Sequence, residues 1–138
     1  LGPEGGAALA EGLKGNTTLQ SLDLEDNVLL PEGGAALAEG LKGNSTLQSL
    51  NLRYNGLGPK GGTALAEGLK DNLTLQSLDL YDNNIGAEGA SALAAVLKET
   101  RISKLNIGYN DIRAEGASTL AGILKETQIT DLNIRYNR

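Results

Sequence analysis

The side chains that could do chemistry in this chain of 138 residues are few in kind, because the sequence contains no His and no Cys. It therefore lacks the usual general base near neutral pH, any thiol nucleophile, and the common nitrogen and thiolate ligands of metals. No glycine-rich phosphate loop is present either. We expect a protein that is not an enzyme, with no catalytic residues, no cofactor and no metal site.

Tyrosines and charged residues at regular spacing remain as candidates for recognition. Tyrosine is favoured at protein interfaces because it offers a rigid amphipathic surface at low entropic cost. The predicted partner-binding residues are Tyr54, Tyr81, Tyr109, Tyr136, Arg53, Arg135, Glu25, Asp26 and Asp79. The alternative is that these tyrosines merely suit exposed strand ends.

The spacing of these residues comes from a repeated string, LxxLxLxxN. Its copies are LQSLDLEDN (19–27), LQSLNLRYN (47–55), LQSLDLYDN (75–83), ISKLNIGYN (102–110) and ITDLNIRYN (129–137). The repeats divide the chain into 1–28, 29–56, 57–84, 85–111 and 112–138, a single domain without caps. Internal repeats at such a period indicate a solenoid.

Each repeat predicts one strand and one helix before it. Leu22 and Leu24 alternate with polar residues, the period of two that is typical of a half-buried strand. The predicted strands lie near residues 21–24, 49–52, 77–80, 104–107 and 131–134. The leucines of the first three strands should be almost fully buried, namely Leu22, Leu24, Leu50, Leu52, Leu78 and Leu80. The helices show apolar or small residues at i, i+3, i+4 and i+7.

Glycines punctuate these predicted helices. Gly15 and Gly43 follow the last apolar position, as left-handed helix caps would. Gly12, Gly40 and Gly68 lie inside the helices, where glycine is unfavourable unless it allows close approach of a neighbour.

On these motifs the chain resembles the leucine-rich-repeat proteins, specifically the long-repeat type found in ribonuclease inhibitor and the NOD-like receptors. The resemblance implies an α/β fold: a right-handed β/α solenoid with a parallel sheet on the concave face and helices on the convex face. It also implies that the closing asparagine of each repeat bonds to loop backbone. We carry this structural role to Asn27, Asn55, Asn83, Asn110 and Asn137.

Three asparagine sequons recur in the predicted helix-to-strand loops. They begin at Asn16, Asn44 and Asn72, and in a secreted chain an exposed loop of this kind accepts a glycan. The alternative is that these Asn-Thr loops serve simply as turns.

Charge and hydropathy narrow the class of partner. The formal net charge is -5, which does not fit a nucleic-acid or anionic-membrane binder. No apolar run reaches the ~20 residues of a membrane span. We expect protein partners only, with no nucleic acid and no membrane.

Two functions remain open. The first is a structural scaffold that is one period of a longer head-to-tail array or fibre. Placing Leu1 after Arg138 continues the repeat in register, and Arg135 would then face Glu25 of the next unit. Charge agrees, because residues 1–84 carry 5 basic and 11 acidic side chains, and residues 85–138 carry 7 and 6. The second is a recognition module that binds a partner on its concave tyrosine and charged face.

Overall fold

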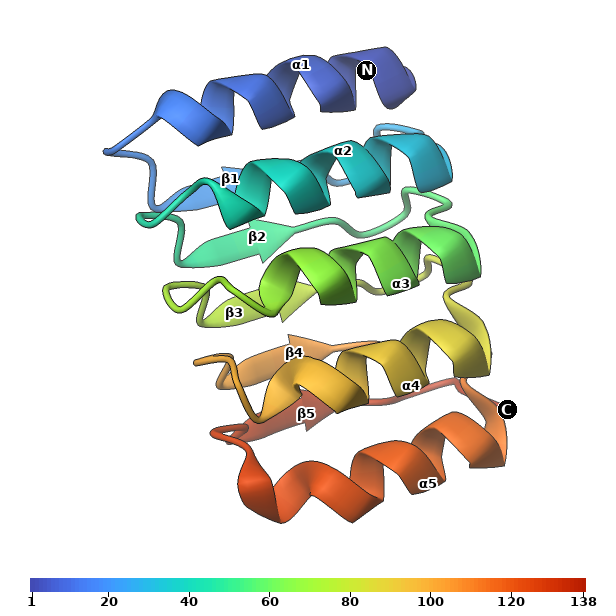
Figure 1. Ribbon diagram of the computed structural model, residues 1–138. Coiled ribbons are helices and arrows are strands. Elements are labelled where there is room, and N and C mark those ends of the chain that lie inside the picture. The colour runs from blue at the N-terminus through green and yellow to red at the C-terminus, as the bar shows by residue number, and fades with distance from the viewer.

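The computed structural model describes residues 1–138 as a stack of alternating helices and strands (Figure 1). The helices are α1 (Gly2–Gly15), α2 (Leu30–Lys42), α3 (Gly58–Leu69), α4 (Gly86–Leu97) and α5 (Arg113–Ile123), which is followed by the 3₁₀ turn η1 (Leu124–Glu126). The strands are β1 (Ser21–Asp23), β2 (Ser49–Asn51), β3 (Ser77–Asp79), β4 (Lys104–Asn106) and β5 (Asp131–Asn133). They form one parallel sheet in chain order, the β/α solenoid that the sequence predicts.

The strands pair in the register of the repeat. Leu22 lies opposite Leu50, and Leu50 lies opposite Leu78. This register holds through β4 and β5, although the fourth and fifth repeats have 27 residues and the first three have 28. Each position of the repeat therefore becomes a row of side chains that crosses the whole sheet.

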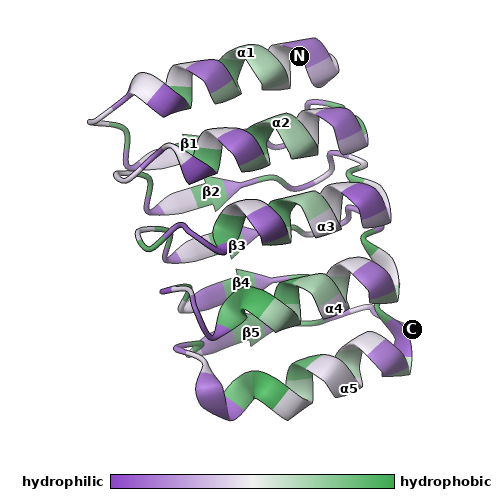
Figure 2. Ribbon diagram, viewed as in Figure 1, coloured by the Kyte–Doolittle hydropathy of each residue, from purple (hydrophilic) through white to green (hydrophobic).

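The core is one cluster of buried residues from the helices, the strands and the loops between them. Figure 2 shows hydrophobic segments in green that alternate with hydrophilic ones in purple along the helices. Leu24, Leu50, Leu52, Leu78 and Leu80 are buried, as predicted. Leu22 departs from the prediction, because it is only half-buried. A neighbouring repeat covers it on one side only, whereas Leu50 and Leu78 have neighbours on both sides.

Two helix glycines allow neighbouring helices to approach closely, as expected. A Cβ atom on Gly40 would lie 2.8 Å from the Ala10 carbonyl oxygen, and one on Gly68 would lie 2.5 Å from that of Ala38. Gly12 occupies the equivalent place in α1 and meets nothing within 4 Å. In α2 and α3 the glycine requirement therefore comes from the helix that precedes each of them in the stack.

The predicted left-handed helix caps are wrong. Gly15 is the last residue of α1, and Gly43 has a φ of -90° in the right-handed region. Both helices end with a backbone bond that closes the last turn instead. No helix combines the length and apolar character that a membrane crossing requires.

Left-handed backbone is concentrated in the loops that lead from strands to helices, along one edge of the stack (Figure 1). Three alternate positions of each such loop have a φ near +55 to +70°, and non-glycine residues occupy most of them. This conformation costs an ordinary L-residue roughly 1–2 kcal/mol. Val28 is the extreme case, because it is β-branched and has a φ of 53°.

We expect Val28→Asn to raise the free energy of unfolding by about 1 kcal/mol, because asparagine tolerates the left-handed region. The equivalent residue of another repeat is already an asparagine, Asn84, with a φ of 54°. The measurement is the urea midpoint. Val28→Ile keeps the β-branch and serves as the control, with no gain expected. A midpoint for Val28→Asn at or below that of the parent chain would contradict the strain.

Candidate functional site

All four tyrosines come together as one row at the end of the sheet where the strands lead into the strand-to-helix loops. We call Tyr54, Tyr81, Tyr109 and Tyr136 the tyrosine row. Its ring centroids are 5.6 Å, 6.1 Å and 6.3 Å apart in that order, and the first and last pairs meet edge to face. Contacts of this kind stabilise aromatic pairs by ~0.5–1.5 kcal/mol. Because Tyr54, Tyr109 and Tyr136 are also exposed, the row presents a continuous aromatic surface to solvent.

Three members of the row occupy left-handed backbone positions. Tyr54, Tyr109 and Tyr136 have φ values of 55°, 54° and 56°. The same position holds Asp26 and Asp82 in the other two repeats, and aspartate tolerates this conformation better. A tyrosine therefore costs local backbone energy here, which a preference for strand ends does not explain.

Tyr81 reaches the row from one residue earlier in its repeat, because Gly108 leaves room for its ring. A Cβ atom on Gly108 would lie 2.9 Å from Cδ2 and 3.1 Å from Cε2 of Tyr81. Partial desolvation, followed by the nearby Tyr54, raises the pKa of the Tyr81 hydroxyl above its usual value. The Tyr81 phenol, like that of any tyrosine, is protonated at neutral pH and can donate a hydrogen bond.

We expect Gly108→Ala to displace the Tyr81 ring and to weaken the near-ultraviolet circular dichroism of the chain. The sequence contains no Trp, Phe or Cys, so this signal comes from the four tyrosines alone. Gly122→Ala is the matched control, because nothing lies within 4 Å of a Cβ atom there. An unchanged near-ultraviolet spectrum for Gly108→Ala, with far-ultraviolet spectra alike, would show that the glycine does not position Tyr81.

Two arginines lie over rings of the row. The guanidinium carbon of Arg53 is 5.4 Å from the Tyr54 ring centroid and 5.0 Å from that of Tyr81. Arg135 lies 5.4 Å from the ring centroid of Tyr136. Contact with the Tyr54 side chain first, and then the charges of Asp79 and Glu25, raises the pKa of Arg53 above its ordinary value.

The Nε atom of Arg53 is buried and has no hydrogen-bond partner. The side chain is therefore held mainly by ring faces and nearby charge. It fixes Tyr54 and Tyr81 relative to each other, because one planar cation contacts both rings.

Two of the predicted acidic residues, Asp79 and Glu25, accept hydrogen bonds within the chain in addition to lying at the candidate surface. Asp79 accepts hydrogen bonds from the backbone N–H of Tyr81 at 3.0 Å and from Asn106 Nδ2 at 3.1 Å. Glu25 accepts one from Asn51 Nδ2 at 3.1 Å. The structure gathers no group of three or more acidic side chains that could hold a metal ion.

A hollow of about 740 Å³ lies beside the C-terminal half of the tyrosine row. It is lined by Asp82, Asn84, Tyr109, Asn110, Asp111, Arg113, Tyr136 and Arg138. Within it Arg113 Nη2 pairs with Asp111 Oδ2 at 2.9 Å, which leaves Asp82 as a carboxylate without an ion pair. The sequence analysis predicted Tyr109 and Tyr136 as binding residues and Asn110 as a structural one. It missed the other lining residues, because their common feature is their position in space: Asp82, Asn84, Asp111, Arg113 and Arg138.

The closing asparagines hold the strand-to-helix loops together from within. Asn83 Oδ1 accepts from the N–H groups of Asn55 and Leu57, and its Nδ2 donates to the Leu52 and Leu80 carbonyl oxygens. Asn55 and Asn110 are buried in the same arrangement, and Asn27 and Asn137 are half-buried. The loops that carry the tyrosine row are therefore held in place by the hydrogen bonds of these asparagines.

A second set of stacked asparagines lies in the helix-to-strand loops, at the opposite edge from the closing asparagines. The prediction that these sequons are exposed is wrong for two of the three. Asn44 and Asn72 are 4% and 3% exposed. Asn44 Nδ2 donates to the carbonyl oxygens of Leu13 and Asn16, and Asn72 Nδ2 donates to those of Leu41 and Asn44. A glycan on either nitrogen would require these buried bonds to break. Asn16 is half-buried and stays a prediction as a glycan acceptor.

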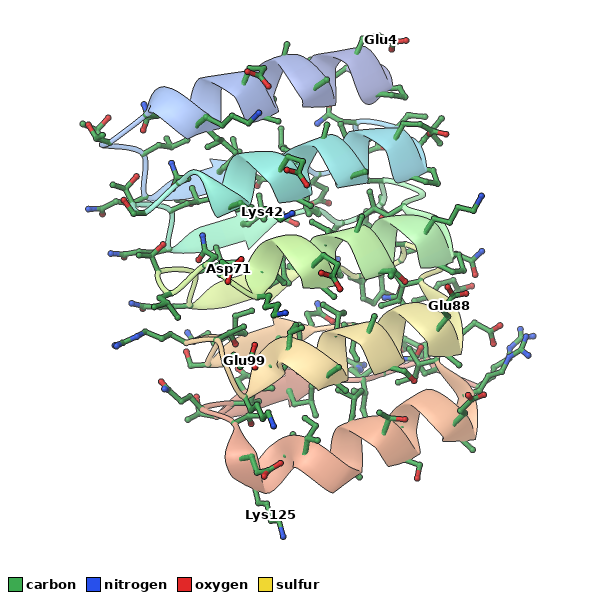
Figure 3. All side chains as sticks on the ribbon, viewed as in Figure 1. Glu4, Lys42, Asp71, Glu88, Glu99 and Lys125 are labelled. Carbon is green, nitrogen blue, oxygen red and sulfur yellow. The ribbon has the colours of Figure 1, made fainter.

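The exposed face of the helices carries charged side chains, some of which form ion pairs with each other. Figure 3 labels charged side chains on the helices and on the turns that follow them, namely Glu4, Lys42, Asp71, Glu88, Glu99 and Lys125. Lys14 pairs with Glu11 at 2.8 Å, and Lys42 pairs with Glu39 at 2.9 Å. Exposed pairs of this type contribute little and indicate a solvated face.

Comparison with known proteins identifies the class. The family model described as "Leucine Rich repeat" matches residues 15–38, 43–66, 71–94 and 102–121, which together cover more than half of the chain. The protein therefore belongs to the leucine-rich-repeat family, and the long-repeat type is compatible with these matches. No curated protein matches the chain in sequence.

Solved structures support the fold. The chain is similar to leiomodin-1 actin-binding site 2, with a TM-score of 0.84 and 20% identity, covering 92% of this chain and 77% of that one. It is also similar to the tropomodulin C-terminal domain of Caenorhabditis elegans, with a TM-score of 0.79 and 13% identity, covering 97% of this chain and 83% of that one. At these identities the likeness shows the fold alone.

Proposed function

We propose that this chain is a non-catalytic protein-recognition module whose contact surface is the tyrosine row. The observation that carries the proposal is the placement of Tyr54, Tyr109 and Tyr136 in left-handed backbone. Strained backbone of this kind persists where the surrounding structure imposes it, and it is concentrated at functional sites. The repeat imposes this backbone in every loop, and three of the five repeats place an exposed tyrosine there in spite of the cost. Tyrosine is favoured at protein interfaces, which accounts for that choice.

The composition of the surface supports a protein partner. Tyrosine and arginine are among the residues that contribute most to binding at protein interfaces. Arg53 holds two rings in place before any partner arrives, which lowers the entropy cost of binding. The leiomodin-1 structure of the same fold is named for binding actin, a protein, and this supports the class of ligand.

A displayed peptide library tests the proposal. Binders are selected on the parent chain after depletion on the Tyr54→Ser/Tyr109→Ser double variant. We expect several unrelated binders, each losing at least about tenfold in affinity on either single variant. Leu73→Ser is the control, because Leu73 is another exposed apolar residue, 57% exposed, far from the row in the helix-to-strand loop. Binders that tolerate both tyrosine changes would contradict the proposal.

Tyr109→Asn separates binding from stability. Asparagine tolerates the left-handed region, so the gain in backbone energy offsets the lost ring contacts, and stability should change by less than about 1 kcal/mol. Affinity for the selected binders should still fall. A large loss of stability with unchanged affinity would assign the row a purely structural role.

The second candidate is the head-to-tail array. We infer that the face of α1 and β1 receives another repeat of this type, on the same chain or on a second copy. The first repeat supports this, because Leu1, Leu9 and Leu19 are exposed there, whereas the equivalent Leu29, Leu37 and Leu47 of the second repeat are fully buried. At the other end of the stack, Ala121 of α5 is exposed and would face Gly12 of a following unit.

Light scattering over a range of concentrations tests the array. Reversible growth in mass is expected for the parent chain and should be lost in Gly12→Arg, whose side chain fills the glycine position. Ser45→Arg, in an exposed loop of the second repeat, is the control and should assemble as the parent does. A constant monomer mass would remove self-assembly of this chain as a function.

A further inference from the structure

We propose that the hollow beside Tyr109 binds an arginine side chain of the protein partner. This inference rests on the proposed recognition role of the tyrosine row and names the partner's chemistry at one position. It makes Tyr109 and Asp82 a subsite for a single planar cation.

The chain itself contains two examples of an arginine that lies over a tyrosine of the row. Two repeats carry Arg-Tyr-Asn where the strand ends, Arg53-Tyr54-Asn55 and Arg135-Tyr136-Asn137. In both, the guanidinium carbon lies 5.4 Å from the centroid of the tyrosine ring that follows it. The fourth repeat reads Gly108-Tyr109-Asn110 and lacks the arginine.

Tyr109 is therefore the one ring of the row without a cation from this chain. The Arg53 guanidinium lies over Tyr54 and Tyr81, and that of Arg135 lies over Tyr136. Tyr109 is 54% exposed, so its ring remains available to a partner. Because Gly108 carries no side chain, nothing of its own repeat supplies the missing contact.

The surroundings of Tyr109 suit a cation. Asp82 lines the same hollow and forms no ion pair, whereas the charge of Arg113 is balanced by Asp111 at 2.9 Å. Arg138 also lines the hollow and acts against a cationic ligand. Since Arg135 already lies over Tyr136, the remaining contributions are the Asp82 carboxylate, the ring face of Tyr109 and one opposing charge from Arg138.

Arginine fits this set better than other side chains. Its planar guanidinium stacks on an aromatic face and donates to a carboxylate in its own plane at the same time. Lysine carries a point charge that is more strongly hydrated. An apolar side chain would leave the Asp82 carboxylate partly desolvated without compensation.

The test is an amide NMR titration of the ¹⁵N-labelled chain with N-acetyl-arginine N-methylamide. The control probe is the citrulline analogue, which has nearly the same shape and no charge. We expect saturable shifts around Tyr109 and Asp82, with citrulline at least about tenfold weaker. Tyr109→Leu and Asp82→Asn should each weaken the arginine probe severalfold. Arg138→Ala should strengthen it, because the opposing charge is removed.

Tyr54→Leu is the matched control, because the Tyr54 ring already carries Arg53, and the arginine titration should be unchanged. Equal binding of citrulline, shifts centred on Tyr54, or no saturable shift up to about 0.1 M probe would overturn the inference. Row-dependent library binders without an arginine near Tyr109 would also overturn it and leave the recognition role intact. Absence of any row-dependent binder would instead remove the recognition role.

Discussion

Replacing Asn83 with alanine is expected to lower the free energy of unfolding by at least about 3 kcal/mol. The Asn83 side chain is buried and serves two N–H donors and two carbonyl acceptors of neighbouring turns, from Asn55, Leu57, Leu52 and Leu80. Each buried polar group left without a partner costs ~1–3 kcal/mol. Urea denaturation followed by far-ultraviolet circular dichroism measures the loss.

Asn27→Ala is the matched control for this prediction. Asn27 is half-buried, its Nδ2 donates to the Glu25 carbonyl oxygen at 3.1 Å, and its Oδ1 accepts only from the chain's terminal amine. We expect a loss less than half of that at Asn83. Equal losses of unfolding free energy at Asn83 and Asn27 would mean that burial of the asparagine side chain is not what stabilises the loops.

Truncation of Leu52 to alanine should cost about 2–5 kcal/mol, because the side chain is fully buried and the cavity cannot collapse completely. Leu22→Ala is the comparison within the chain, since Leu22 is half-buried, and its cost should be clearly smaller. The same denaturation experiment measures both. A loss below about half a kcal/mol at Leu52 would mean that its side chain is not part of the core.

Most of the fold follows from the period of the repeat. Residues with the same place in each repeat lie opposite one another in the sheet, as Leu22, Leu50 and Leu78 do. A strand that pairs in this way must place alternate side chains in the core, so the nine-residue motif predicts the strands and their buried leucines. The helices follow from the apolar spacing of the segment before each motif.

The departures from prediction arise where an outcome depends on neighbours or backbone angles. Leu22 has the same motif as Leu50 but lacks one neighbouring repeat. Gly43 ends its helix with ordinary right-handed angles, because a backbone bond to Leu41 closes the turn. Asn44 reads as a sequon, and its burial follows from bonds to Leu13 and Asn16 in the preceding repeat.

The candidate surface was predictable as a set of residue types but not as a geometry. The repeat places Tyr54 and Tyr109 in one column, and it places Tyr81 in another. In the structure the Tyr81 ring lies in the row, because it occupies space that a side chain at position 108 would fill. The left-handed angles of the tyrosines have no signature in hydropathy, because the same position accepts Asp26.

Tyrosine-selective NMR is the most direct test of the central claim that the tyrosine row is a protein-binding surface. The chain has four tyrosines and no Trp or Phe, so ¹³C labelling of tyrosine gives signals from the row alone. Adding a protein or peptide partner that binds the chain should shift or broaden these four signals, with backbone amide changes concentrated on the strand-to-helix edge. Unchanged tyrosine signals at saturation, with the amide changes on the helical face instead, would contradict the account.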